Sequence, residues 1–134
     1  MTYQARNNIP RASLGRIVLY VHDVESVSDF YECHFNFTAS REEGDRIVEL
    51  LSNNEDGFSI LLHPLGKKRK AGQTLAKLIF DCEDVEAFCA ASAERGLEFG
   101  ALHSGAGYKF ANTKDPAGNS VSISSRIYRH NLCR

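Results

Sequence analysis

The amino-acid sequence predicts an α+β fold in which one β-α-β-β-β unit occurs twice in tandem. The first observation behind this prediction is a repeated helix start. Asp23-Val24-Glu25 recurs as Asp84-Val85-Glu86, each time directly after a strand-like segment. The second is that three further segments with strand-like patterns follow each predicted helix. An internal repeat of this kind constrains the fold more than any single motif does.

The first unit opens with a strand and a helix whose buried faces follow from their periodicity. Over residues 15–21, Ile17, Leu19 and Val21 share one face, as in a strand with one buried side. Asp23 is a suitable N-cap for a helix over 24–35, whose apolar side chains recur every three or four residues. The three strands expected after this helix cover residues 36–41, 45–52 and 57–63.

The second unit repeats this order. Residues 77–82 predict a strand, and we expect the following helix to end at Gly96, which suits the position after a helix C-cap. The stretch Asp115-Pro116-Ala117-Gly118-Asn119 has Pro and Gly where a tight turn needs them, so it predicts a hairpin. The three strands expected after the second helix cover residues 97–102, 107–113 and 119–125.

The length of 134 residues is sufficient for one compact domain with a buried core. We expect this domain to span residues 14–126, between polar tails at 1–13 and 127–134. Within it, the two units cover 14–63 and 76–126, and a polar connector over 64–75 joins them. The connector carries a Lys/Arg run at residues 67–70, which we interpret as a solvated loop because no aromatic residues are interleaved with it.

Composition excludes several classes of function. The formal net charge of −1 argues against a general nucleic-acid-binding protein, which would be clearly basic. No apolar run is long enough to cross a membrane, and the first residues lack the apolar core of a signal peptide. The four cysteines include no Cys-x-x-Cys pair, and we expect them to be reduced. We therefore expect a cytoplasmic protein with neither a membrane nor a nucleic-acid partner.

The doubled unit, the Phe30-Tyr31 pair and the closing Asp115-Pro116-x-Gly118-Asn119 turn resemble the vicinal oxygen chelate superfamily. This superfamily includes glyoxalase I, bleomycin- and fosfomycin-resistance proteins, extradiol dioxygenases and methylmalonyl-CoA epimerase. The resemblance implies mixed sheets that curl around a cleft, with two units completing a site within one chain or across a homodimer. It specifies the fold more than the activity, because the same scaffold hosts several chemistries and also non-catalytic drug binders.

The resemblance also implies where a metal ion would be held, on the first and last strands of each unit. In this chain those places fall on Arg16, Leu61, Lys77 and Ser122, and the place of Leu61 is set only to within two residues. Divalent metal sites are built from His imidazoles and carboxylates, and two permanent cations would repel the ion. We therefore expect that the family's metal site is lost and that no cofactor is bound.

Strand alternation predicts the cleft wall independently of this alignment. If the apolar side chains of each strand face the core, the side chains between them face the cleft, because a shift by one residue would bury Arg16 and Lys77. The residues expected to line the cleft are Arg16, Val18, Tyr20, Leu61, His63, Lys77, Ile79, Asp81 and Ser122.

From this wall we predict a homodimer whose cleft binds a small, anionic organic molecule. The ligand-binding candidates are Arg16, Tyr20, Leu61, His63, Lys77, Asp81 and Ser122. An equally open interpretation is that Asp81 or Glu49 neutralises Arg16 and Lys77 within the chain.

Three further alternatives remain open from the sequence. The first is a metal-dependent lyase, epimerase or dioxygenase with an atypical site made of His63, Glu49 and His103. The second is a metal-free enzyme that uses His63 as acid and base, with Tyr20 as a second candidate catalytic residue. The third is a protein-interaction module whose cleft is filled by its own side chains.

Overall fold

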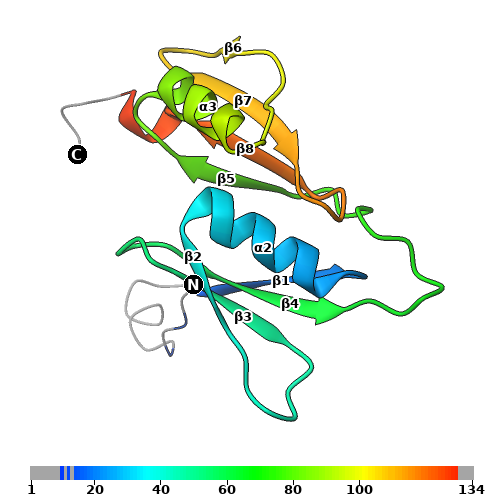
Figure 1. Ribbon diagram of the computed structural model, residues 1–134. Helices are drawn as coiled ribbons and strands as arrows, with labels where there is room; N and C mark the ends of the chain where they lie inside the picture. The colour runs from blue at the N-terminus through cyan, green and yellow to red at the C-terminus, as the bar shows by residue number, and fades with distance from the viewer. Residues whose placement is uncertain (1–9, 11, 13, 130–134) are drawn as a thin grey trace, which may run out of the picture.

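The computed structural model describes residues 10, 12 and 14–129 of the chain. Apart from residues 10 and 12, the expected tail at 1–13 lies outside the described residues, as do residues 130–134 of the other tail. The described part contains two four-stranded sheets, each accompanied by one helix (Figure 1). This is the α+β arrangement of two β-α-β-β-β units that the sequence predicts. Neither helix has the length and apolar character that crossing a bilayer requires.

The first sheet has the strand order β1-β4-β3-β2. Its elements are β1 (Arg16–Val21), α2 (Val24–Phe35), β2 (Phe37–Ser40), β3 (Val48–Ser52) and β4 (Ser59–Pro64). The strand β1 pairs in parallel with β4, which places Arg16 opposite Ser59 and Tyr20 opposite His63. The other strand pairs of this sheet are antiparallel.

The second sheet repeats this topology in the order β5-β8-β7-β6. Its elements are β5 (Lys77–Asp81), α3 (Val85–Glu94), β6 (His103–Ser104), β7 (Lys109–Lys114) and β8 (Ser120–Ser124), followed by the 3-10 helix η1 (Arg126–Tyr128). The strand β5 pairs in parallel with β8, and β7 pairs antiparallel with both β8 and β6.

One sequence prediction is wrong in this unit. The expected strand over 97–102 is not formed, and the edge strand is the two-residue β6 instead. Leu97 and Phe99 do alternate towards the core, but the Leu97 N–H donates to Ser92 O at the end of α3, and the Thr113 hydroxyl rather than a backbone N–H donates to Glu98 O. The Gly100 N–H does donate to Asn112 O of β7, but these other contacts interrupt a regular backbone ladder, so the segment is irregular. The boundary expected between the domain and the tail at 127–134 falls within η1.

The repeated helix starts are confirmed in their capping geometry. The Asp23 carboxylate accepts a hydrogen bond from the Ser26 N–H, and the Asp84 carboxylate accepts one from the Ala87 N–H. Each cap satisfies a backbone donor that has no partner within the helix. The helix over 24–35 has the predicted bounds and ends at Asn36, which has a left-handed backbone conformation.

The core joins the two units through α2. This helix lies between the first sheet and β5 (Figure 1), and its buried side chains include Val27, Phe30, Tyr31 and Phe35. The Phe35 ring stacks on the Phe80 ring of β5 with 4.2 Å between the ring centroids. Burial of such aromatic side chains is a large part of the stability of a small domain.

A buried hydrogen-bond cluster also connects the units. The Tyr31 hydroxyl donates to the Asp115 carboxylate at 2.9 Å, and both residues are almost fully buried. The same carboxylate accepts from the backbone N–H groups of Ala117 and Asn119 and from the Asn119 side-chain amide. Burial and the neighbouring Asp115 charge raise the pKa of Tyr31, which keeps the phenol protonated as a donor. The hairpin turn predicted at 115–119 is therefore fixed to α2.

Candidate functional site

Each sheet packs one face against the core and leaves the other face uncovered by the helices. The core side takes Leu19, Val21, Ile60 and Leu62 from the first sheet, and Val121 and Ile123 from the second. The predicted alternation is therefore confirmed. The opposite side of the first sheet, called here the first open face, includes Arg16, Val18, Tyr20, Glu49, Leu51, Leu61 and His63. The second open face includes Lys77, Ile79, Asp81, Phe110, Asn112, Lys114, Ser120, Ser122 and Ser124.

The first open face combines an ion pair with an aromatic contact. The Arg16 guanidinium lies 3.3 Å from the Glu49 carboxylate, so a carboxylate of the same chain neutralises this cation. The Tyr20 ring packs against the His63 ring with 5.1 Å between centroids, and Tyr20 is 56% exposed. His63 Nδ1 lies 2.8 Å from the Pro64 carbonyl oxygen. Because a carbonyl only accepts, Nδ1 carries the proton of this hydrogen bond, and Nε2 of the neutral ring holds the lone pair.

The second open face carries cations with neutral partners. The Lys77 ammonium donates to the Asn112 side-chain oxygen, and the Lys114 ammonium donates to the Ser120 hydroxyl. Ser122 is on this face by register, but it is buried, and its hydroxyl donates to Ala111 O. Asp81 is exposed at the far end of β5.

The predicted site residues therefore form two groups rather than one. Arg16, Tyr20, Leu61 and His63 lie together on the first open face with Glu49, whereas Lys77, Asp81 and Ser122 lie on the second. Neither of the two cavities described below is lined by residues of the first open face. The structure thus places the two groups on different sheets.

The residues at the places that the resemblance implies for metal ligands do not fit a metal ion. Two are cations, one is aliphatic, and the Ser122 hydroxyl is already hydrogen bonded. The atypical alternative has His63 and Glu49 on β4 and β3 of the first sheet, but His103 on β6 of the second sheet. Within residues 10, 12 and 14–129, no three His, Cys, Asp or Glu side chains are grouped so that they could hold a metal ion.

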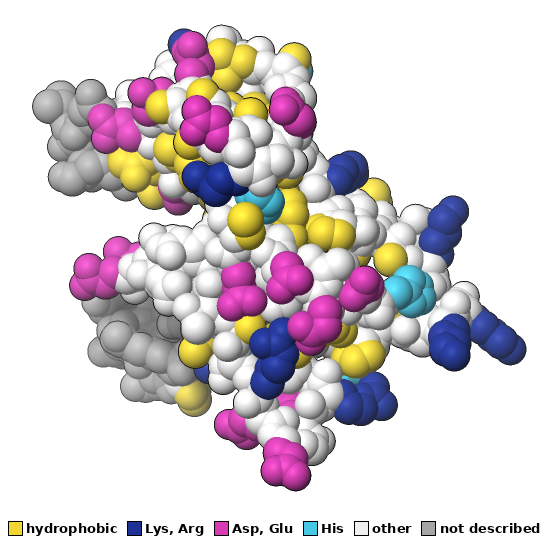
Figure 2. Space-filling view, in the orientation of Figure 1, with side chains coloured by type: hydrophobic (Ala, Val, Ile, Leu, Met, Phe, Trp, Pro, Cys, Tyr) yellow, Lys and Arg dark blue, Asp and Glu magenta, His cyan; other side chains and the backbone are white. Residues whose placement is uncertain are grey.

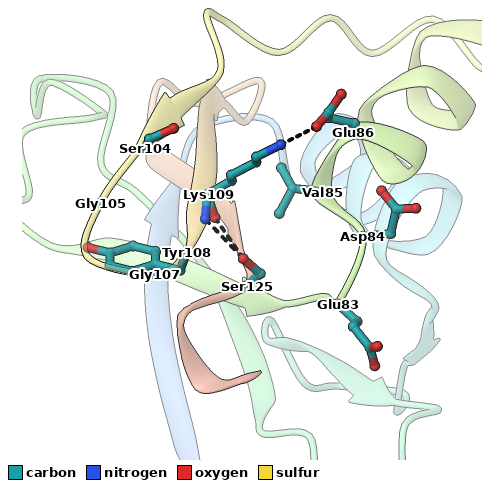
Figure 3. A pocket seen from close by; sticks show the side chains of 10 residues that line it. All are labelled: Glu83, Asp84, Val85, Glu86, Ser104, Gly105, Gly107, Tyr108, Lys109 and Ser125. Carbon is teal, nitrogen blue, oxygen red and sulfur yellow. Dashed lines mark hydrogen bonds and ion pairs between the residues drawn. The ribbon is translucent and has the colours of Figure 1, made fainter. Parts of the chain in front are cut away.

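A cavity of about 620 Å³, which sequence reasoning did not identify, lies between the start of α3 and the loop before β7 (Figure 3). Its lining residues are Glu83, Asp84, Val85, Glu86, Ser104, Gly105, Gly107, Tyr108, Lys109 and Ser125. The Lys109 ammonium donates to Glu86 at 2.6 Å, and this hydrogen bond and the charge attraction raise the pKa of Lys109. Because Asp84 is used as the helix cap, most charges of this cavity have partners within the chain.

A second cavity, of about 400 Å³, lies at the connector end of the second open face. It is lined by Gly72, Gln73, Thr74, Leu75, Ala76, Lys77, Lys114 and Ser120. Sequence reasoning identified Lys77 but missed Lys114. Strand alternation could have identified Lys114, because it lies two residues after Asn112 and so on the same face of the strand that enters the predicted hairpin.

Solved structures of the same fold are similar to most of the chain. TnmS3, described as an antibiotic binding protein from Streptomyces sp. CB03234, has 22% identity and a TM-score of 0.70, with 87% of this chain and 97% of that chain covered. The crystal structure of UcmS2 has 18% identity and a TM-score of 0.73, with coverage of 87% and 99%. Lactoylglutathione lyase from Agrobacterium tumefaciens has 18% identity and a TM-score of 0.64, with coverage of 86% and 94%. These similarities show the fold. No curated protein compared with the chain matched it.

The family is established by the match to a sequence model. The model of the Glyoxalase/Bleomycin resistance protein/Dioxygenase superfamily matches residues 13–123, which is most of the chain. This match confirms the resemblance drawn from the repeated units and the closing turn. The chain belongs to the glyoxalase/bleomycin resistance protein/dioxygenase superfamily.

Proposed function

We propose that this chain is a metal-free binding protein of its superfamily and that it binds a small organic molecule with an anionic group. The observation that supports this most is the composition of the two open faces. Val18, Tyr20 and Ile79 are 40%, 56% and 59% exposed, and they stand beside cations and hydroxyl groups on the same faces. Apolar walls with a few polar groups are typical of small-molecule sites. The antibiotic binding protein among the similar structures is consistent with this role.

The proposal includes a homodimer that completes the binding cleft. Each open face would form one wall of the cleft. Neither of the two cavities of the single chain is lined by residues of both faces. A second copy of the chain can bring its second open face against the first open face of its partner. The exposed apolar side chains on both faces would then be removed from water, which favours association.

This binding function is tested by NMR titration of the full chain with a panel of small aromatic carboxylic acids. We expect binders to shift the amide signals of β1, β4, β5 and β8. Shifts confined to the cavity beside α3 would place the ligand elsewhere and contradict the proposal. An absence of any binder, together with no small molecule retained on purification, would also contradict it.

We expect the purified protein to contain no stoichiometric Zn, Ni, Fe or Mn. The physical reason is that the places of the family's ligands hold cations, an aliphatic side chain and a hydrogen-bonded hydroxyl. Elemental analysis of protein expressed in medium with these metals measures this directly. Near one metal equivalent per chain that is lost in His63→Ala would show that the strand alignment and the functional proposal are both wrong.

Metal-free acid–base chemistry at His63 is a second candidate function. The observation that favours it is the hydrogen bond to Pro64 O, which orients the ring and leaves Nε2 as the free nitrogen beside Tyr20. The imidazole side chain can both accept and donate a proton near neutral pH, which suits acid–base chemistry. If the bound molecule is converted by the wild type, His63→Gln should still bind it but form no product. Unchanged product formation by this variant would exclude the role.

A further inference from the structure

We propose that the cavity beneath the connector is an oxyanion-binding site that takes the carboxylate or phosphate group of a small organic molecule. The proposal rests on the proposed function, since it specifies which end of the second open face holds the anionic group. It assigns this role to Lys77, Lys114 and Ser120 rather than to Arg16, which Glu49 already neutralises.

The three residues form one row across three neighbouring strands. Ser120 of β8 is in register with Lys77 of β5 on one side and with Lys114 of β7 on the other. Neighbouring strands are about 4.8 Å apart, so the two lysines flank a single hydroxyl group on the same side of the sheet. All three line the cavity of about 400 Å³. The sheet therefore holds two cationic donors and one hydroxyl at one place.

The charges in this row lack an internal counterion. The ion pairs found among the described residues are Arg16–Glu49, Arg41–Glu25 and Lys109–Glu86, and none involves Lys77 or Lys114. The nearest carboxylate on the same strand is that of Asp81, four residues and so about 13 Å along β5. The Lys114 ammonium donates to the Ser120 hydroxyl and the Lys77 ammonium to the Asn112 side-chain oxygen, so both cations have only neutral partners, and a bound anion would neutralise them. In the cavity beside α3, by contrast, Lys109 already has Glu86 as its partner.

The hydroxyl of Ser120 is arranged to donate to such an anion. Its oxygen accepts the hydrogen bond from the Lys114 ammonium at 3.0 Å. The hydroxyl proton must therefore point to another acceptor, and no acceptor for it is found among the described residues. A hydroxyl that accepts from a cation is also a better donor, because hydrogen bonds in a chain strengthen one another. An oxyanion in the cavity can thus receive three charge-assisted hydrogen bonds.

The connector is held against the sheet by a close backbone contact. Gly72 has φ of +72°, and a Cβ atom at this position would lie 2.9 Å from the carbonyl oxygen of Ala117. Only glycine permits this approach at no steric cost. The Asp115 carboxylate fixes the turn that Gly72 contacts, through bonds to Ala117 N, Asn119 N and the Tyr31 hydroxyl. The wall of the cavity formed by residues 72–76 therefore rests on a rigid support.

The dimensions favour a small organic acid. The cavity exceeds the size of a phosphate group, and it adjoins the face on which Ile79 exposes its apolar side chain. A ligand that places its anionic group between the lysines can lay an apolar body along this face. Further Lys and Arg side chains gather where the connector protrudes (Figure 2), and they include Lys67 and Lys68, which do not line the cavity. Those lysines attract anions to the region without forming the site.

The test is a titration of the ¹⁵N-labelled full chain with inorganic phosphate and with acetate at low salt. We expect saturable shifts at the amides of residues 72–77, 114 and 120. The double variant Lys77→Gln/Lys114→Gln should bind phosphate about tenfold or more weakly, the effect of losing a charged hydrogen bond. The control Lys67→Gln/Lys68→Gln removes the same charge from the connector and should change the affinity less than about twofold. Gly72→Ala should weaken binding although both lysines remain.

Several outcomes would overturn the inference. If the two double variants weaken phosphate binding equally, the phosphate is attracted diffusely by net charge and not by this site. If Lys77→Gln/Lys114→Gln binds phosphate as tightly as the wild type, the site is excluded. Tighter binding of a short single-stranded oligonucleotide, lost in Lys67→Gln/Lys68→Gln, would assign the region to nucleic acid instead. If an aromatic acid binds the wild type and Lys77→Gln/Lys114→Gln equally, the inference fails while the proposed function stands. If phosphate binds as expected but no organic molecule binds, the proposed function fails, and the cavity is a site for a free inorganic anion rather than for an organic acid.

Discussion

Asp115→Ala is expected to lower the free energy of unfolding by about 3–5 kcal/mol. This is the usual cost of removing one partner from a buried, charged hydrogen-bond network. The Asp115 carboxylate is 4% exposed and accepts four hydrogen bonds, from the Tyr31 hydroxyl, two backbone N–H groups and the Asn119 amide. Its removal leaves buried donors without acceptors, and each costs about 1–3 kcal/mol. Equilibrium urea unfolding followed by circular dichroism measures the change.

Two variants show whether this loss comes from the hydrogen bonds. Tyr31→Phe removes one donor and leaves the other three, so it should cost about 1.5–3 kcal/mol, as expected for one hydrogen bond to a charged group. Pro116→Ala alters an exposed side chain of the same turn and should change stability much less. If Asp115→Ala were no more destabilising than Pro116→Ala, the cluster would not be what joins the hairpin turn to α2.

Ile79→Glu and Tyr20→Glu are each expected to convert a homodimer into a monomer. Ile79 is 59% exposed and Tyr20 is 56% exposed in the single chain, and they lie on the two open faces that we propose to meet between copies. A charge placed in the apolar part of such an interface would be desolvated without a partner. For the wild type we expect a dimer that buries more than about 1,000 Å², the lower range for a stable interface. Sedimentation velocity at tens of micromolar distinguishes the states.

Leu102→Glu is the matched control for this experiment. Leu102 is 44% exposed in the loop before β6 and belongs to neither open face, so the charged variant should remain dimeric. A wild-type chain that sediments as a monomer would contradict the dimer proposal outright. A dimer that persists in both open-face variants would show that the subunits meet elsewhere.

Most of the fold could be predicted because its signals are local. The caps Asp23 and Asp84 act on residues three positions away, and strand alternation decides which side chains face the core. The prediction failed at 97–102 because Leu97 and Phe99 have strand-like alternation in an irregular segment. Whether such a segment joins a sheet depends on partners that are distant in the sequence.

The site was predictable only in part, since its contacts are long-range. Alternation correctly placed Arg16 and Lys77 on open faces, but it could not decide whether a carboxylate neutralises them. The structure pairs Arg16 with Glu49, 33 residues away, and leaves Lys77 with the neutral Asn112. Likewise, no local pattern shows that Gly72 contacts the turn at Ala117, so the sequence predicts only a polar connector over residues 64–75.

Native mass spectrometry of the full chain purified from its source tests the central claim most directly, because one spectrum reports metal, retained small molecule and subunit number. We predict a dimer whose mass exceeds that of two chains by a small organic molecule, with no metal ion. The molecule should dissociate in buffer with high phosphate, and it should be absent from Lys77→Gln/Lys114→Gln prepared in the same way. A spectrum with one divalent metal ion per chain, or a monomer that retains no ligand, would contradict the proposal that this is a metal-free binding protein.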